Sequence, residues 1–501
     1  MIKYPSANQV SIDDFLIPQG KQLNPENRWI KLAKIIPWDE LSLVYSKKMS
    51  KKMGRKGITP RIVIGAVIIK HMKSLSDEET IEEIRENSYM QYFLGYAEYT
   101  YEQVFTPSLF VTIRRRLGKA EFDAMIDDII KRTEEVIAKQ AEKKRDRKTP
   151  KDKDDQSNKG HLIVDATVAP ADIKYPTDLD LLNEARENSE LIIDLLWEGK
   201  RGKKKPRTYR RKARSEYLSV AKKRKKSKKL LRKSIGKQLR YLHRNFKTIE
   251  KMLDTTEQTT FPLSFKHQRT YWIIQELYRQ QKKMYETNSH TTSDRIVSIS
   301  QPHIRPIVRG KAGKNVEFGA KLSLSLVDGN CRLFNISWDA YNESGDLIGQ
   351  IEEYKDVYGN YPAYVSGDGI FGTRKNREYM KSRGIKYTGV ELGRRRQLTE
   401  ELKSYYKEKK KKSRERVKVE GKFGEGKRKY QLDLVMAKRS DTSESWISAV
   451  IFVMDIAHLL RVIFLSVFEK VKFAIKKINN TIKWLLLITN TDYKQLKMAT
   501  F

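Results

Sequence analysis

The chain has 501 residues, enough for about two to four domains at ~100–200 residues each. Lys and Arg number 101 against 63 Asp and Glu, and the resulting net charge of +38 attracts polyanions such as nucleic acid. The single cysteine, Cys331, excludes a disulfide within the chain and a zinc site built on several thiolates, and it suits a reducing cytosol.

Residues 1–140 are predicted to form an all-helical domain. The first residues lack the apolar core of a signal peptide. Ser76 and Glu79 have the spacing of a capping box at the start of a helix. A basic tract in such a domain is typical of a DNA-binding module, and an ordinary packing or dimerisation domain is the alternative. The basic candidates for DNA contact here are Arg114, Arg115 and Arg116.

Residues 141–160 have almost no apolar content and are predicted to be a charged linker. After the linker, residues 161–175 and 301–440 are expected to form one α/β domain. Its strands are expected at residues 161–167, 319–327, 333–338, 362–366 and 385–388, and its helices at 342–354 and 374–383. Asp328-Gly329-Asn330 is expected to form a hairpin turn between the second and third of these strands. This order fits a mixed sheet flanked by helices, as in RNase H-like nucleases, although periodicity alone does not choose it over another α/β sheet.

Residues 176–300 interrupt this domain after its first strand and are predicted to be a helical, basic insertion. Between Lys200 and Arg240 there are 21 Lys and Arg and one acid, Glu216. A disordered basic tail or a localisation signal is the alternative, but a position between two strands argues against a tail. The candidates for phosphate contact are Lys203, Lys204, Lys205, Arg210, Arg211, Lys222, Lys223 and Arg224.

Residues 441–501 are predicted to be helical. The longest apolar stretch, Trp446 to Phe468, contains Asp455, His458 and Arg461. A membrane-spanning helix needs ~20 mostly uncharged residues, so this stretch is predicted to be a buried helix.

Two aspartates follow apolar runs and are expected at the C-terminal ends of strands. Asp165 closes the run that begins at His161, and Asp368 follows the run that begins at Tyr361. If the two strands are neighbours, both carboxylates converge, and a divalent cation would hold both ionised. Oxygen ligands favour Mg²⁺ or Mn²⁺ over zinc, and two such ions can drive phosphoryl transfer.

A third acid, Glu420, is expected on the helix that follows. Arg416 and Lys427 lie four residues before it and seven after it, so all three are expected on one helix face. The glycines at 421, 424 and 426 weaken this helix prediction, and a close approach of backbone or DNA is a possible reason for them. Glu425 is a rival for the third acid, but only Glu420 has both basic spacings.

Several of these segments also carry a resemblance to a known family. They are residues 57–79 and 84–95, the long run Val164–Arg186, the motif Gly367–Gly372 with Asn376–Tyr379, and the helix around Glu420. In them the chain resembles an insertion-sequence DDE transposase of the IS5 group, IS1182-like. The resemblance implies that Asp165, Asp368 and Glu420 are the acidic triad.

The same resemblance implies that Arg416 and Lys427 are the basic members of the family's Y-R-E-K signature. Ser413 stands where that signature has its tyrosine, which puts the tyrosine's contact near the transposon end in doubt. The metal ligands are unaffected by this departure.

The sequence therefore predicts a DNA transposase that binds the inverted-repeat ends of an insertion sequence. It would cut each end with metal-activated water and join the freed 3′-hydroxyl to target DNA. Three alternatives remain: an RNase H-like nuclease without strand transfer, a non-catalytic DNA-binding relic, and an RNA-associated basic protein. A homodimer is expected because two ends must be held together, and the expected location is the cytoplasm, at the nucleoid of a bacterial or archaeal cell, with no membrane.

Overall fold

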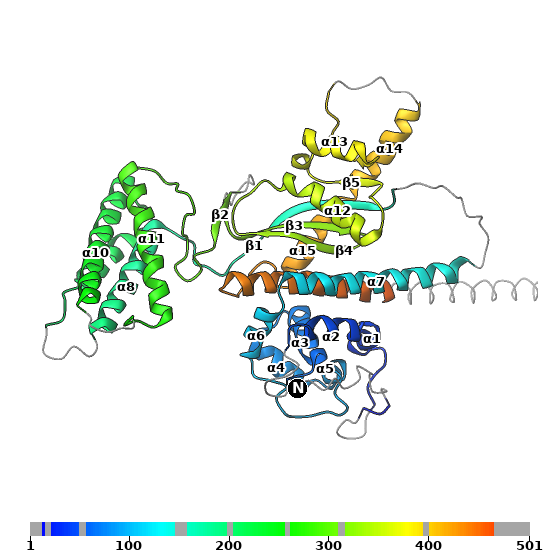
Figure 1. Ribbon diagram of the computed structural model, residues 1–501, viewed down its shortest axis with the longest axis horizontal. Helices are drawn as coiled ribbons and strands as arrows, with labels where there is room; N and C mark the ends of the chain where they lie inside the picture. The colour runs from blue at the N-terminus through cyan, green and yellow to red at the C-terminus, as the bar shows by residue number, and fades with distance from the viewer. Residues whose placement is uncertain are drawn as a thin grey trace, which may run out of the picture.

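The computed structural model describes residues 13–15, 22–49, 57–145, 158–197, 204–255, 261–308, 316–393 and 400–464. These residues combine a helical N-terminal part, a central mixed sheet and a helical insertion to one side of the sheet (Figure 1). Lys203 and residues 465–501 lie outside the described residues. The predictions of a phosphate contact at Lys203 and of helix at the end of the chain therefore stay predictions.

The N-terminal part is helical, as the sequence predicts. Its helices are α1 (Arg28–Ile35), α2 (Trp38–Ser46), α3 (Pro60–Lys73), α4 (Asp77–Glu86), α5 (Ser88–Leu94), α6 (Leu109–Arg116) and α7 (Lys119–Arg145). The predicted capping box is present at α4, where the Ser76 side chain accepts from the Glu79 N–H and the Glu79 carboxylate accepts from the Ser76 N–H. Helix α7 continues into the segment that the sequence predicts to be linker.

The central sheet has six strands in the order β2-β3-β1-β5-β6, with β4 also paired to β3. The strands are β1 (His161–Pro170), β2 (Arg305–Val308), β3 (Val316–Val327), β4 (Asn330–Ser337), β5 (Tyr364–Ser366) and β6 (Lys386–Tyr387). Strand β1 is antiparallel to β3 and parallel to β5. The predicted Asp328-Gly329 hairpin turn is present, with both residues at positive φ between Val327 and Asn330.

Two predictions about the strands are wrong. The first strand runs to Pro170 rather than ending near Asp165, because its second half still pairs with β3 after β5 has ended. The short strand β2 is not predicted at all. It contains Pro306 and pairs with β3 alone at the edge of the sheet, where proline is tolerated.

Alternate residues of β1 face two different layers. Leu162 and Val164 pack with α12 (Leu347–Tyr358) and α13 (Arg374–Ser382). Ile163 faces the opposite layer, which is formed by the N-terminal helices and the helix Ser440–Phe464. Because side chains alternate along a strand, Asp165 points to the same side as Ile163.

The helix Ser440–Phe464 lies between the sheet and the N-terminal helices, unlabelled and orange in Figure 1. By length and composition alone it could span a membrane, yet 61% of its most apolar window is buried in the protein. Its residues Ile447, Phe452 and Leu459 are fully buried in the shared core. This is the buried helix that the sequence predicts.

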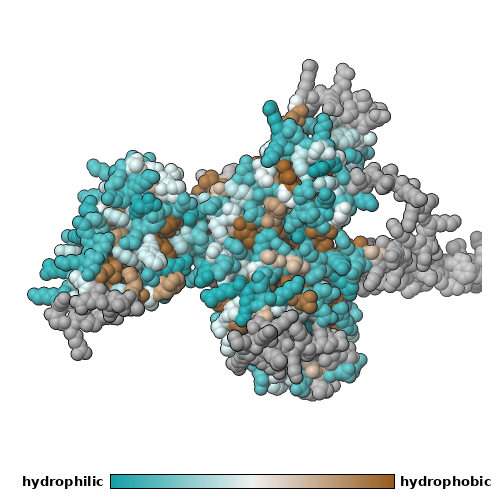
Figure 2. Space-filling model, in the orientation of Figure 1, coloured by the Kyte–Doolittle hydropathy of each residue, from teal (hydrophilic) through white to brown (hydrophobic). Residues whose placement is uncertain are grey.

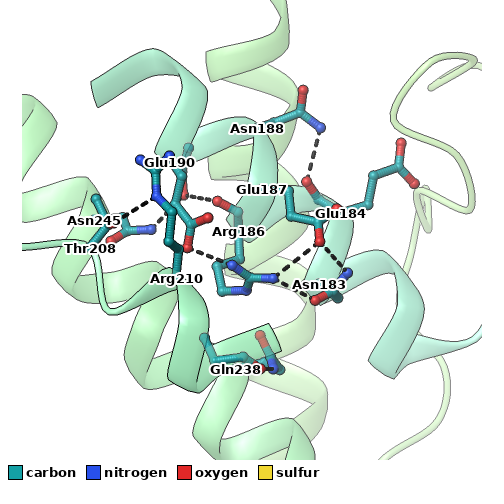
Figure 3. Close-up of polar contacts among 12 residues, drawn as sticks. Asn183, Glu184, Arg186, Glu187, Asn188, Glu190, Thr208, Arg210, Gln238 and Asn245 are labelled. Atoms are coloured by element: carbon teal, nitrogen blue, oxygen red, sulfur yellow. Dashed lines mark hydrogen bonds and ion pairs between the residues drawn. The ribbon is translucent and has the colours of Figure 1, made fainter. Parts of the chain in front are cut away.

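The insertion between β1 and β2 is helical, with a hydrophobic core of its own. Its helices are α8 (Asp178–Trp197), α9 (Arg210–Ala221), α10 (Lys228–Asp254) and α11 (Phe265–Thr287). A fully buried arginine, Arg186, sits inside it and donates to the carboxylate of Glu190 and to the side-chain oxygen of Asn183 (Figure 3). Paired burial of this charge holds the polar centre of α8 in place.

Candidate active site

Asp165 and Asp368 come from neighbouring parallel strands. The β1–β5 ladder pairs Ile163 with Ser366 and then stops. Continuing that register by two residues sets Asp165 level with Asp368. The two aspartates therefore flank the point where the strands separate, which is the convergence that the sequence predicts, although Asp165 is in mid-strand.

The turn that carries Asp368 is built by tight local packing. A Cβ at Gly367 would lie 2.8 Å from Val164 Cγ2 and 2.9 Å from Phe371 Cδ2, so only glycine fits there without a shift. The buried side chain of Asn376 donates to the carbonyls of Ser344 and Phe371 at 2.8 and 2.9 Å. These contacts give a structural reason for the Gly367–Gly372 and Asn376 motifs.

Glu420 lies in the first turn of α15 (Val417–Lys429), with Arg416 as the N-cap residue. Arg416 Nη2 is 3.2 Å from Glu420 Oε1, and Arg416 Nη1 is 3.7 Å from Asp368 Oδ1. The guanidinium therefore lies between the two acids. Helix α15 also contacts β1, which brings it to the side of the sheet that Asp165 faces.

The charges of Arg416, Asp368 and Glu420 all act on the pKa of Asp165. Burial raises the pKa of Asp165, and the carboxylates of Asp368 and Glu420 raise it further. The Ala166 N–H, which donates to Asp165 Oδ1 at 2.8 Å, and the guanidinium of Arg416 act in the opposite direction. Two acids from distant segments thus lie close enough to Asp165 to affect its pKa.

The residues suit a divalent cation by donor type. All three candidates are carboxylates, the ligands that Mg²⁺ and Mn²⁺ prefer. Within the described part of the chain, no group of three or more His, Cys, Asp or Glu side chains is arranged to hold a metal ion. The cation that now lies between Asp368 and Glu420 is the guanidinium of Arg416.

The other residues considered near Glu420 lie in different parts of the structure. Lys427 lies in α15, and Ser413 is exposed near the end of α14 (Glu400–Arg414). The rival acid Glu425 binds Arg461 of the helix Ser440–Phe464. Its carboxylate therefore serves the packing of α15.

Of the three arginines predicted to contact DNA, two have partners within the protein. Arg114 makes a two-pronged hydrogen bond to the carboxylate of Asp77, at 3.0 and 2.7 Å, and its side chain is 15% exposed. Arg116 lies 3.4 Å from the Tyr45 hydroxyl. Arg115 is exposed, so it has the placement that a phosphate contact needs.

Two of the basic candidates in the insertion form ion pairs within the protein. Lys205 and Arg210 bind the carboxylate of Asp194, at 2.8 and 2.7 Å. Both side chains are still nearly half exposed, and the other described candidates are exposed as well. In Figure 2 hydrophilic residues cover much of the visible face of the insertion. The exposed candidates are Lys204, Arg211, Lys222, Lys223 and Arg224.

Tyr387 and Arg377 are neighbours of the site that the sequence did not single out. The Tyr387 hydroxyl donates to the carbonyl of Asp368 at 3.1 Å. The guanidinium of Arg377 stacks 5.0 Å from the centre of the tyrosine ring and donates to the Gly372 carbonyl. Tyr387 lies on β6, which the sequence predicts at 385–388, but a predicted strand does not reveal which side chains its residues contact.

Comparison with known proteins identifies two regions. The family described as "Transposase domain (DUF772)" matches residues 18–116, and the family described as "Transposase DDE domain" matches residues 365–457. An uncharacterized protein, ORF8 in the nfe locus of Rhizobium meliloti, is 28% identical over 163 residues, which is 32% of this chain and 71% of that protein. No solved structure matches the chain.

Proposed function

The chain is an insertion-sequence DDE transposase by these two family matches, and from this premise we propose that it cuts and rejoins DNA at the ends of its element. The substrate would be double-stranded DNA with inverted-repeat ends, and the enzyme would act as a homodimer on nucleoid DNA in the cytoplasm. Membership of the IS5 group remains a prediction.

One observation carries the proposal. Asp368 and Glu420, which are far apart in the chain, share the guanidinium of Arg416, and both influence the pKa of Asp165. An acid cluster on a basic protein is costly unless cations neutralise it. The strand order supports the same interpretation, because β1, β3 and β4 are antiparallel neighbours and β5 and β6 run parallel to β1, as expected of an RNase H-like core.

In the proposed reaction, Asp165, Asp368 and Glu420 would hold the divalent ions. Bound ions of this kind activate water and stabilise the leaving oxygen. The three carboxylates must be ionised to do this, and Arg416 can turn its positive charge toward the scissile phosphate.

The chemistry balances in both steps. In cleavage, a water oxygen bonds to phosphorus while the P–O3′ bond breaks, so the element keeps a free 3′-hydroxyl. In joining, this hydroxyl attacks a phosphodiester of the target and displaces its 3′ oxygen. One phosphodiester replaces another, and no further energy source is needed.

The exposed cations support the proposed binding of DNA. Arg115 on α6 and the turn Lys222–Arg224 between α9 and α10 lie on separate parts of the molecule. Cations that neutralise phosphates release counterions, so binding of this kind should weaken steeply with salt.

The test is a joining assay with the full chain. Labelled duplexes that carry the inverted repeats flanking the coding region are incubated with a target plasmid and Mg²⁺. We expect cleaved ends and a longer joined product, and neither product with Asp165→Asn, which should still bind the duplex. Cleavage without joining would favour the nuclease alternative, and binding without cleavage by the wild type would favour the relic. Stronger competition by structured RNA than by duplex DNA would favour the RNA-associated protein.

A further inference from the structure

A buried histidine lies where the three acid-bearing segments meet. His161 is the first residue of β1, the strand that carries Asp165, and its side chain is only 8% exposed. Its Nε2 lies 2.7 Å from the hydroxyl of Ser366, the last residue of β5. Its Nδ1 lies 3.5 Å from Oε2 of Glu415, which immediately precedes Arg416. One imidazole thus touches each of the segments that supply the proposed acids.

The neighbours of His161 determine where its proton lies. Partial burial acts to raise the pKa of Glu415, but Lys418 and Lys412 lower it to about 2. This carboxylate is therefore ionised and can only accept hydrogen bonds. The proton of a neutral imidazole therefore belongs on Nδ1, toward Glu415, and Nε2 accepts from Ser366. The Ser366 hydroxyl can in turn accept from Thr388, at 2.7 Å. Burial lowers the pKa of His161, which agrees with the neutral form.

The contacts of His161 with Ser366 and with Glu415 differ in how much they contribute to holding neighbouring segments together. Strands β1 and β5 are already joined by their backbone ladder, so the contact with Ser366 duplicates an existing link. The break between α14 and α15, at Glu415 and Arg416, has no such ladder. The ion pair from Arg416 to Asp368, just after β5, is 3.7 Å long, and its side chains are 33% and 65% exposed, so it is a weak tether. At 3.5 Å the contact between His161 Nδ1 and Glu415 is too long to count as a hydrogen bond, and it is an attraction between a buried N–H and a charged carboxylate that is 24% exposed.

We propose that His161 is a positioning residue, which holds the start of α15 against β1 so that Glu420 faces Asp165 and Asp368. The inference rests on the proposed metal-dependent function of these acids. It assigns His161 no contact with DNA or with a metal. Its effect passes through Glu415, and the contact with Ser366 orients the ring.

Two substitutions separate the two contacts. The amide of Asn reaches about as far from Cα as Nδ1 of histidine, and the amide of Gln reaches about as far as Nε2. His161→Asn therefore keeps a donor toward Glu415, whereas His161→Gln keeps a partner for Ser366 and loses Glu415. Both replace the same ring by an amide, so each is the matched control for the other.

The measurement is Mn²⁺ binding to the full chain by calorimetry, together with the Mn²⁺ dependence of end cleavage. We expect His161→Gln to weaken Mn²⁺ binding about tenfold, the low end of the effect of losing an outer partner of a metal site. His161→Asn should stay close to the wild type. At saturating Mn²⁺ both variants should recover most of the maximal cleavage rate, because the ligands themselves are intact.

Equal Mn²⁺ affinities for the two variants would overturn the proposal, since loss of packing alone would affect both alike. If His161→Gln does not fold, Glu415→Ala removes the same contact from the partner that is 24% exposed, and it must show the same tenfold loss. Wild-type affinity in Glu415→Ala would equally overturn the positioning role. Failure of the wild type to bind Mn²⁺ would overturn the proposed function and this inference together, which distinguishes it from failure of the inference alone.

Discussion

Two glycines of α15 should respond in opposite ways to the same substitution. A Cβ at Gly421 would meet no heavy atom of the described residues within 4 Å beyond its immediate surroundings in the chain. A Cβ at Gly426 would lie 2.9 Å from Met454 Sδ and 3.1 Å from Leu432 Cδ2. The first glycine has no packing reason among the described residues. At the second, where α15 packs on the helix Ser440–Phe464, a Cβ would force the side chains of Met454 and Leu432 to shift.

The magnitudes follow from these distances. Alanine is favoured over glycine in a helix interior by about 1 kcal/mol, so Gly421→Ala should raise the free energy of unfolding by up to that amount. Overpacking typically costs about 1–3 kcal/mol, so Gly426→Ala should lose the helix gain and end about 0–2 kcal/mol less stable than the wild type. The two variants should therefore differ by roughly 1–3 kcal/mol.

Urea unfolding followed by circular dichroism measures this difference, and each variant is the control for the other. The reasoning about packing is refuted if Gly426→Ala is as stable as Gly421→Ala. Gly421 also neighbours Glu420 on an open surface, where we expect DNA to approach. Gly421→Ala should then cut DNA ends less well although it is more stable, and unchanged cleavage would show that this glycine admits no close contact.

Three further outcomes are expected. In metal-free protein at neutral pH, Asp165→Asn should be more stable than the wild type, because burial raises the pKa of this carboxyl and ionising it is costly. The gain should vanish as the pH falls through that pKa, and a gain independent of pH in urea unfolding would contradict the reasoning. Arg114→Ala should lose about 1–3 kcal/mol, because partly buried Asp77 loses its two-pronged partner, whereas exposed Arg115→Ala should change thermal stability little. Replacing Lys222–Arg224 by alanines should reduce the slope of log K against log salt for DNA binding by up to about 2.7, at ~0.9 per charge, and an unchanged slope would exclude this turn from the interface.

The sequence predicted most of the secondary structure and supplied three acids as candidates for the site. Short-range rules were sufficient there, because a capping box, a two-residue turn and an alternating strand each depend on a few neighbouring residues. The capping box at Ser76 and the Asp328-Gly329 turn are examples. Edge strand β2 was missed because four residues with a proline carry no strand pattern.

The site required long-range information. Nothing local to Asp165 reveals that β5 ends beside it while β3 continues, and this difference in ladder length places the aspartate in mid-strand. Spacing left Glu425 as a rival for Glu420, and the tertiary contact with Arg461 assigns it to packing. Arg114 similarly turned from a candidate DNA contact into the partner of Asp77.

By itself, then, the sequence determined the helices, the strands, the strong positive charge and the acids that could carry the chemistry, since these depend on residue type and on spacing along the chain. Only the tertiary structure decided which charges already have partners and which side chains meet. Those contacts join residues separated by tens to hundreds of positions, as from His161 to Glu415. Their geometry depends on strand register and helix packing, which no local pattern encodes.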